Sequence, residues 1–308
     1  MSERAVVFAG QGAQTVGMGR DLYEAYAVCR SLYERADEVL GFGLSRLCFD
    51  GPLEALTRSD RCQPAIFVTS AACFAALGVE APGLAFAGAA GLSLGEWTAL
   101  YAGGALSFED TLRVLEARGR FMQEACEERE GAMLSVIGLA EEQLRAVAAA
   151  TGVELANLNS PEQTVLSGER QAILEAEKAA QAAGAKRTVR LPVAGAFHSS
   201  LMASAAARLE AFLASVPFRA PSLPVLSNAT GAPHGGPDEI RRQMVRQVTS
   251  PVQWIGCVRW LAQRGVRTYV ECGPGKVLSG LIRRIEAEAQ TADVQNVATL
   301  KKTAAAVK

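Results

Sequence analysis

Short apolar runs that end near glycine alternate along the chain with longer segments in which apolar residues recur every three or four positions. A continuous apolar run bounded by glycine, such as Ala5 to Ala9, is typical of a buried parallel strand, and the longer period is typical of a helix. Other strand-like runs lie at 85–91, 224–228 and 266–271, and helix-like segments at 21–40, 62–77, 108–127, 200–215 and from about 250. This alternation predicts an α/β protein with a parallel sheet.

Residues 131–193 follow a different rhythm. Strand-like segments lie at 132–138, 153–158, 163–167 and 186–193, and helical segments at 141–150 and 170–183. The order β-α-β-β-α-β is the split ferredoxin-like pattern. We therefore expect a compact insert that forms a second wall over a cleft in the larger domain.

Residues 62–79 carry no charge over 18 positions, a length at which a membrane span has to be considered. Gln63, Pro64, Thr69 and Ser70 interrupt the run. A buried core helix is the better interpretation.

The composition narrows the class of protein. With 308 residues, 49% of them hydrophobic, the chain can bury a sizeable core, and a net charge of −1 argues against nucleic-acid binding. Seven dispersed cysteines without a C-x-x-C pair indicate free buried thiols in a reducing compartment. The first residues lack the features of a signal peptide. We expect a cytoplasmic protein that binds neither nucleic acid nor a membrane.

Gly91-Leu92-Ser93-Leu94-Gly95 has the spacing of a nucleophile elbow, in which a strand turns sharply into a helix with serine at the turn. The turn leaves no room for a Cβ two residues before or after the serine. The serine then adopts a strained conformation, with its Oγ exposed near the positive end of the helix dipole. A flexible glycine-rich loop is the alternative, and the pentapeptide alone does not decide between them.

Gly10-Gln11-Gly12 forms a second glycine-bracketed turn after the first strand. It lacks the Lys-Ser/Thr ending of a P-loop and the third glycine of a dinucleotide fingerprint. Its backbone N–H groups lie at the carboxyl end of a strand, where α/β sheets place their sites. An ordinary β-to-α turn is the alternative.

Arg118 is predicted to lie on the buried face of its helix. Its neighbours one turn away are all apolar: Val114, Leu115, Phe121 and Met122. A buried guanidinium needs an anionic partner because it cannot lose its proton. That partner is either a core carboxylate in a structural salt bridge or a substrate carboxylate held bidentately.

The chain has two histidines. His198 lies where the predicted insert returns the chain to the larger domain, which suits a catalytic base, although a structural histidine is the alternative. His234 lies among glycines and prolines, which predicts an exposed turn. With two histidines, no H-E-x-x-H motif and no clustered cysteines, we expect no metal site.

Seven motifs together resemble one family, the malonyl-CoA:acyl carrier protein transacylases of fatty acid synthesis, and the match extends to about residue 285. The motifs are Gly10-Gln11-Gly12-Ala13-Gln14, Gly91-Leu92-Ser93-Leu94-Gly95-Glu96, Arg118-Gly119-Arg120-Phe121-Met122-Gln123, Asn157-Leu158-Asn159-Ser160-Pro161, Gly195-Ala196-Phe197-His198-Ser199, Pro251-Val252-Gln253-Trp254 and Gly273-Pro274-Gly275-Lys276-Val277-Leu278.

The resemblance implies an α/β-hydrolase-like large domain with a parallel central sheet, formed by residues 1–127 and 196–308, and a ferredoxin-like subdomain at 128–195. It implies transfer of a malonyl group from coenzyme A to the phosphopantetheine thiol of acyl carrier protein. The partners would be malonyl-CoA and acyl carrier protein, with no cofactor beyond the thioester substrate. Basic residues that would meet an acidic carrier are Lys186, Arg187, Arg190, Arg283 and Arg284.

The resemblance also implies roles for individual residues. Ser93 would be the nucleophile and His198 the base. The third member is usually a backbone carbonyl, and Gln253 matches the position that orients the histidine. The backbone N–H groups of Gln11 and Leu94 would form the oxyanion hole.

The same resemblance assigns the acyl group its contacts. Arg118 would bind the free malonyl carboxylate, and Phe197 would leave little room for an α-methyl branch. Asn157 and Asn159 are expected to contact substrate. Most members have histidine where this chain has Leu92, so acyl selectivity or rate is where we expect a difference.

Two other functions fit parts of the sequence. A serine esterase or thioesterase shares the elbow and the serine-before-histidine order. However, no carboxylate stands out by motif to orient His198, and Arg118 would have no role. A non-catalytic docking module would be expected to lose Ser93 or His198, yet both are present.

Overall fold

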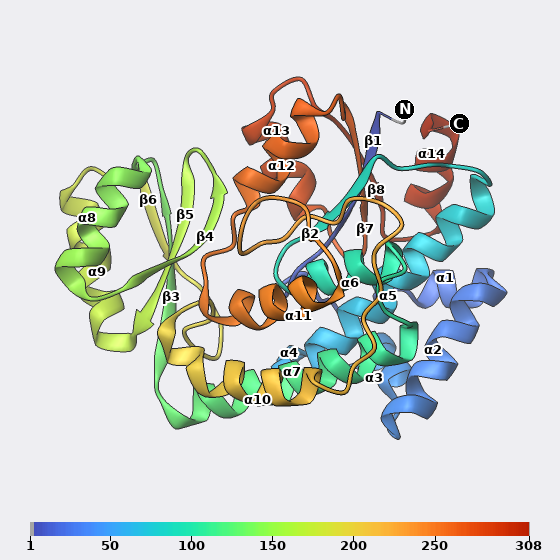
Figure 1. Cartoon of the computed structure of the whole chain (residues 1–308), viewed down its shortest axis with the longest axis horizontal. Helices are drawn as coiled ribbons and strands as arrows, with labels where there is room; N and C mark the ends of the chain where they lie inside the picture. The colour runs from blue at the N-terminus through green and yellow to red at the C-terminus, as the bar shows by residue number, and fades with distance from the viewer. Residues whose placement is uncertain (1–2, 308) are drawn as a thin grey trace.

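The computed structural model describes residues 3–307, which form two sheets with their own helices (Figure 1). Met1 and Ser2, which entered the signal-peptide prediction, lie outside this range. The larger sheet is parallel, in the order β2 (Gly88–Gly91), β1 (Arg4–Phe8), β7 (Thr268–Cys272), β8 (Gln290–Val294). The smaller sheet is antiparallel, in the order β4 (Glu154–Ser160), β5 (Gln163–Glu169), β3 (Gly131–Ile137), β6 (Arg187–Arg190).

Both ends of the chain build the parallel sheet. Val6 of β1 pairs with Ala89 on one side and with Val270 on the other. Strand β1 is buried over Ala5–Phe8, as its continuous apolar run predicts for a strand covered on both faces. The helices of this part are α1 (Arg20–Ala25), α2 (Ala27–Leu40), α3 (Leu44–Asp50), α4 (Leu53–Thr57), α5 (Ser59–Glu80), α6 (Leu94–Ala102), α7 (Phe108–Glu128), α10 (Ala203–Leu213), α11 (Pro237–Arg246), α12 (Trp254–Gln263), α13 (Val277–Ile285) and α14 (Val297–Val307), with the 3₁₀ turns η1 (Ser200–Met202) and η2 (Gln247–Thr249).

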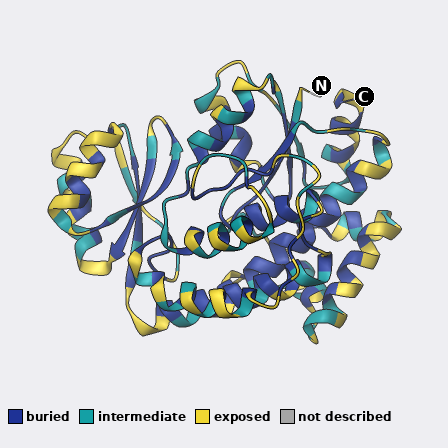
Figure 2. Ribbon diagram, viewed as in Figure 1, coloured by how far each residue is buried: buried dark blue, intermediate teal, exposed yellow. Residues whose placement is uncertain are grey.

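Helix α5 contains the uncharged run. Its length and composition are those of a membrane-crossing helix, but 78% of its most apolar stretch is buried inside the protein. It packs against α7, α2 and α14, and Figure 2 shows it among the buried elements. The prediction of a buried core helix is confirmed.

The antiparallel sheet carries helices α8 (Glu141–Thr151) and α9 (Arg170–Ala182), in the predicted order. The alternation of side chains along β3 separates two environments. Leu134 and Val136 belong to a core cluster with the two helices. Met133 and Ser135 point the other way and line a cleft shared with the larger domain. The antiparallel sheet therefore lines one side of this cleft.

Three elements of the structure differ from those predicted from the sequence. The segment 224–228 forms only isolated bridges, one of them between Ala89 and Val225, rather than a strand. The strand near 266–271 is not the last one, because β8 follows it at the sheet edge. Only Val294 of β8 is buried. Strand β8 therefore lacks the continuous apolar run that is typical of a central strand. The predicted helix over 21–40 is interrupted at Tyr26, whose backbone is extended.

The last helix, α14, contains the residues from Lys301 to Val307. The final residues of a domain are often poorly ordered, but Thr303, Ala304 and Val307 of α14 are buried. Helix α14 packs on α5 and β8. Tertiary packing of an apolar face explains the difference.

All seven cysteines are free and buried, as predicted. Burial raises the pKa of the Cys62 and Cys126 thiols to about 12, because the thiolate would lose its hydration.

The junction of β2 and α6 leaves no space for a side chain at two glycines. A Cβ on Gly91 would lie 2.0 Å from the carbonyl carbon and oxygen of Gly95, and a Cβ on Gly95 would lie 2.2 Å from the Phe8 carbonyl oxygen. These atoms are backbone, so they can yield only if the turn itself moves. The steric argument from the sequence is confirmed.

Replacing Gly91 with alanine should therefore destabilise the fold by about 1–3 kcal/mol, the usual cost of overpacking. Gly78→Ala is the matched control, because Gly78 lies in α5 with nothing within 4 Å of the new Cβ. Alanine there should stabilise by about 0.5–1 kcal/mol through helix propensity. Urea unfolding midpoints measure both, and an unchanged midpoint for Gly91→Ala would contradict the clash.

Candidate active site

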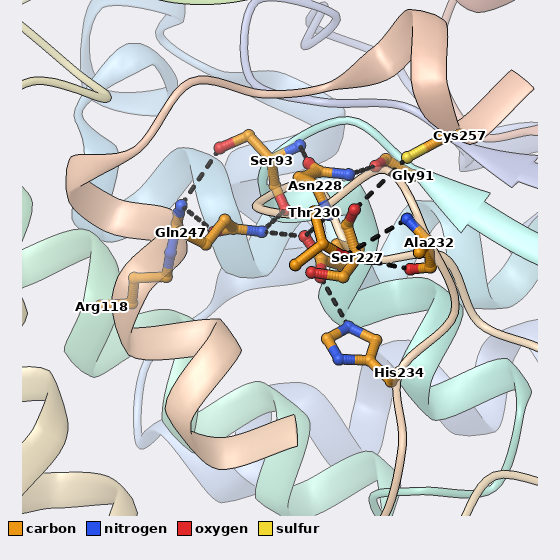
Figure 3. Close-up of polar contacts among 11 residues, drawn as sticks. Gly91, Ser93, Arg118, Ser227, Asn228, Thr230, Ala232, His234, Gln247 and Cys257 are labelled. Atoms are coloured by element: carbon orange, nitrogen blue, oxygen red, sulfur yellow. Dashed lines mark hydrogen bonds and ion pairs between the residues drawn. The ribbon is translucent and has the colours of Figure 1, made fainter. Parts of the chain in front are cut away.

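Ser93 lies at the junction of β2 and α6 with φ 55° and ψ −103°. A non-glycine residue in such a conformation costs of order 1–3 kcal/mol and persists only where its surroundings hold it. Asn228 does so: its Oδ1 accepts from the Ser93 N–H at 2.6 Å, and its Nδ2 donates to the Gly91 carbonyl at 2.8 Å (Figure 3). The Asn228 side-chain amide thus stabilises the turn through hydrogen bonds to the backbone of both Ser93 and Gly91.

The structure brings Ser93 and His198 together. The His198 Nε2 lies 2.8 Å from Ser93 Oγ, and the Nδ1 lies 2.9 Å from the backbone carbonyl oxygen of Gln247. A carbonyl can only accept, so Nδ1 carries the proton and Nε2 is left to accept from the serine hydroxyl. This is the arrangement of a nucleophile and its general base.

The residue that orients the imidazole is Gln247, at the start of η2, and the prediction of Gln253 is wrong. Gln253 precedes α12, and its backbone N–H donates to the Asn228 carbonyl at 2.8 Å. A backbone carbonyl does occupy the third position, as the resemblance implied. It comes from a different glutamine, six residues earlier.

Arg118 is 1% exposed, as its helical period predicts. Its Nη1 donates to Gln63 Oε1 at 2.6 Å, and its Nη2 donates to Gln247 Oε1 at 3.0 Å and to Ser93 Oγ at 3.1 Å. Within residues 3–307 no carboxylate lies within 4.0 Å of the guanidinium, and its Nε has no hydrogen-bond partner. Burial lowers the Arg118 pKa to about 10, while Glu96 acts in the opposite direction. Among the described residues, Arg118 therefore forms no structural salt bridge with a carboxylate.

The site keeps His198 neutral. Burial, followed by the nearby Arg118 cation, lowers the pKa of His198 to about 4, and its contact with the Gln247 carbonyl opposes this. At neutral pH the imidazole therefore has a free Nε2 lone pair.

A cavity of about 260 Å³ opens beside the serine, between the two sheets. The predicted residues Gln11, Phe197, Asn157 and Asn159 line it, together with Leu92. The larger domain, the insert and the returning chain all contribute to its lining. The Asn159 Oδ1 is buried without a partner among the residues described, so it is available to a ligand.

The two expected oxyanion donors are the backbone N–H groups of Leu94, which follows Ser93, and of Gln11, which lines the same cavity as Ser93. Leu94 is the first residue of α6, and Gln11 follows β1 and lines the cavity. Neither backbone N–H donates to another group in the described part of the chain. The positive end of the α6 dipole lies at the same place.

Several polar residues of the site escaped the sequence analysis. Gln63 had a signal, because it is a polar residue in an uncharged run, and Glu96 had one as a charge directly after the elbow. Gln247 and Asn228 gave none. His234 was wrongly placed in an exposed turn: its side chain is buried, with Nε2 2.7 Å from Glu96 Oε1.

No group of three or more His, Cys, Asp or Glu among residues 3–307 is arranged to hold a metal ion.

A parallel-sheet domain that presents a serine–histidine pair beside a buried arginine defines an acyl-transfer enzyme of the serine type. The model of the acyl transferase domain family matches residues 5–307. The chain is 42% identical over 289 residues to Malonyl CoA-acyl carrier protein transacylase of Escherichia coli K12. The match covers 92% of this chain and 93% of that protein. The chain belongs to the malonyl CoA-acyl carrier protein transacylase family.

Solved structures of similar proteins also match the fold of this chain. An acyl carrier protein S-malonyltransferase from Vibrio cholerae has a TM-score of 0.95 at 39% identity, covering 98% of this chain and 100% of that one. A malonyl-transacylase in complex with a type II PKS acyl-carrier protein has a TM-score of 0.94 at 38% identity, covering 99% and 100%. The chain is also 40% identical over 288 residues, 92% of its length, to Polyketide biosynthesis protein ThaF of Burkholderia thailandensis, but it spans only 24% of that longer protein.

The lowered His198 pKa predicts how serine reactivity depends on pH. Protonation removes the Nε2 acceptor, so inactivation by a sulfonyl fluoride should fall only as the pH approaches about 4, not at the ordinary histidine value of 6.5. Arg118→Gln should move the fall to higher pH, because it removes a cation that disfavours the imidazolium. Arg113→Gln, an exposed position on the same helix, should not.

The measurement is the inactivation rate against pH, with circular dichroism confirming that the protein stays folded. This check is needed because the His198 imidazole takes up a proton more readily in the unfolded chain than in the folded protein. The free energy of unfolding therefore decreases as the pH falls from 6.5 to about 4. A wild-type midpoint at 6.5 would contradict the assignment.

Proposed function

We propose that this chain is a malonyl-CoA:acyl carrier protein transacylase, which moves malonyl groups from coenzyme A to the phosphopantetheine thiol of acyl carrier protein. One observation carries the proposal: Ser93 Oγ lies between the His198 imidazole, at 2.8 Å, and the buried Arg118 guanidinium, at 3.1 Å. The names of the similar proteins support the same activity, and one of them is described in complex with its carrier protein.

The reaction proceeds through a malonyl-serine ester. His198 Nε2 takes the Ser93 proton as Oγ attacks the thioester carbonyl. The N–H groups of Gln11 and Leu94 stabilise the resulting oxyanion, at about 3–4 kcal/mol per donor. The C–S bond then breaks, and the coenzyme A sulfur leaves with the proton from His198. The carrier thiol repeats the sequence in reverse and frees Ser93.

Arg118 binds the malonyl carboxylate and so selects the substrate. Its bond to the Ser93 hydroxyl is the one that the incoming carboxylate replaces, while Gln63 and Gln247 continue to hold the rest of the guanidinium. A charge-assisted pair in a buried site is strong because water does not compete. An acetyl group makes no such pair.

The cavity walls complete the acyl site. Phe197 restricts the space beside the malonyl α-carbon, and Asn157 and Asn159 hydrogen-bond the thioester substrate. Leu92, where most members have histidine, gives this wall an apolar surface beside the nucleophile. Its effect is on selectivity or rate rather than on the reaction class.

The site favours transfer over hydrolysis. A hydrolase of this type would normally orient the histidine with a carboxylate, whereas His198 Nδ1 meets the Gln247 carbonyl. Arg118 has no role in an esterase that acts on neutral acyl groups. The serine esterase or thioesterase alternative is therefore not favoured.

We further propose the finer description of the fold. Residues 1–127 and 196–308 form an α/β-hydrolase-like domain, supported by the strand–elbow–helix arrangement at Ser93. Residues 128–195 form a ferredoxin-like subdomain, supported by the strand order β4-β5-β3-β6. The enzyme uses no cofactor beyond the thioester and acts in the cytoplasm, as its free thiols suggest.

The acidic carrier would approach the basic residues beside the cavity. Arg284 donates to Gln163, which lines the cavity, at 3.2 Å. Lys186 and Arg190 pair with glutamates of the insert, which leaves them less suited to this role. Arg187 and Arg283 remain further candidates.

Exposure to malonyl-CoA should add one malonyl group to the wild-type protein, as measured by intact-mass spectrometry. Ser93→Ala should show no adduct, because the attacking oxygen is gone. Ser200→Ala, an exposed serine nearby, should be labelled normally. A labelled Ser93→Ala protein would exclude Ser93 as the nucleophile.

Arg118→Ala should lower kcat/KM for malonyl transfer by about 100-fold. This corresponds to about 2.7 kcal/mol, which lies within the range of about 2–5 kcal/mol for truncating one partner of a buried charge pair. Acetyl transfer should fall far less, since acetyl has no carboxylate. Carrier acylation with each donor measures the ratio, and Arg113→Ala serves as the control. Equal losses for both donors would reject the carboxylate role.

A further inference from the structure

Gln247 contacts His198, Arg118 and Ser93, and it is fully buried. Its backbone carbonyl meets His198, and its Oε1 accepts from Arg118 Nη2. Its Nε2 donates to the Ser93 carbonyl at 2.9 Å and to Glu96 Oε2 at 2.5 Å. One residue thus contacts the base through its backbone, and its side chain links the cation and the nucleophile to a buried carboxylate.

The direction of the Gln247 amide follows from what its partners are able to do. An arginine only donates, so it requires the amide oxygen on its side. The Ser93 carbonyl and the Glu96 carboxylate oxygen both accept, and Glu96 Oε2 already accepts from the Asn228 N–H, so the amide NH₂ has to lie on the side of these acceptors. Reversing the amide would place an NH₂ group against the guanidinium and drive Arg118 away from Ser93.

Glu96 is itself held on three sides. Its Oε2 also accepts from the Asn228 backbone N–H at 3.1 Å, and its Oε1 lies 2.7 Å from His234 Nε2. Glu96 is fully buried. Asn228 is the residue that clips the strained turn at Ser93, so the same carboxylate anchors both amides that hold the nucleophile.

The Gln247 amide also keeps Glu96 and Arg118 apart. A direct ion pair between them would satisfy the guanidinium internally and leave nothing for a substrate carboxylate. With the amide in between, the anion supports the cation only through a neutral group. The arrangement places a buried anion close to the site while leaving Arg118 without a direct carboxylate partner.

We propose that Glu96 is a positioning residue for acyl selection: it fixes the direction of the Gln247 amide, and through that amide it holds the Arg118 guanidinium where a malonyl carboxylate binds. The inference rests on the proposed transacylase function. It assigns a task to a carboxylate that takes no part in the reaction itself, and to His234, which holds that carboxylate in place.

Glu96→Met tests the proposal because it keeps the length of the side chain and removes both acceptor oxygens. Malonyl kcat/KM should fall by about 10- to 100-fold, as expected for the loss of a charge-assisted hydrogen bond. Acetyl transfer should fall less, so the malonyl-to-acetyl ratio drops. A ratio equal to that of wild type would mean that Glu96 is merely structural and would overturn the proposal.

Glu96→Gln is the conservative rescue. Its amide oxygen can occupy the Oε2 place and accept from Asn228 and Gln247. Its NH₂ can then donate to His234 Nε2, because Nδ1 of that histidine has no partner among the described residues and is free to take the proton. The malonyl-to-acetyl ratio should return to near the wild-type value. A ratio as low as that of Glu96→Met would overturn the proposal.

The control for stability is Glu271→Met. Glu271 is also a buried carboxylate, which accepts from the Leu278 and Ser279 backbone N–H groups, and it has no contact with Gln247. Its replacement should lower the unfolding midpoint without lowering the malonyl-to-acetyl ratio. A loss of ratio in this variant as large as in Glu96→Met would show that instability alone explains the effect, and would overturn the proposal.

If Glu96→Met does not fold, Gln247→Met provides the second test. It removes the amide that Glu96 directs but keeps the backbone carbonyl that contacts His198, so the malonyl-to-acetyl ratio should drop. An unchanged ratio would overturn the proposal. Intact-mass labelling of the wild type separates the two levels: without a malonyl adduct the proposed function fails, whereas an adduct with unchanged ratios rejects only the role of Glu96.

Discussion

A buried guanidinium that cannot lose its proton constrains the rest of this site. Arg118 is held by neutral amide oxygens from α5 and η2, so its charge is solvated by the protein without being cancelled. The charge acts on its surroundings, because it contributes to the low pKa of His198. Helix α5 has to be apolar enough to seal the core, yet it has to provide Gln63 for the cation.

Amide side chains suit this setting because each of them both donates and accepts. Asn228 bridges an N–H and a carbonyl of the strained turn, and Gln247 bridges a donor-only cation and two acceptors. The strain at Ser93 is maintained by these hydrogen bonds from distant segments of the chain. The reactive geometry is therefore a property of tertiary structure, even though the turn itself is local.

This division explains what could be predicted from the sequence. The elbow at Ser93 follows from local sterics, and the burial of Arg118 follows from helical period, so both could be inferred from neighbouring residues. The choice between Gln247 and Gln253 depends on which backbone carbonyl reaches His198 across the fold, which no local pattern encodes. For His234, flanking glycines and prolines specify a turn but not the direction of the side chain. Strand β8 was missed because an edge strand needs no continuous apolar run.

The buried cysteines have a consequence for an enzyme whose substrates are thioesters. A thiolate close to an acyl thioester exchanges acyl groups spontaneously. A cysteine thiolate near the site would therefore accept the acyl group in place of Ser93. With pKa values such as those of Cys62 and Cys126, about 12, these sulfurs stay protonated and shielded at neutral pH. The protein can therefore bind two different thioesters in turn without acylation of its own cysteine thiols.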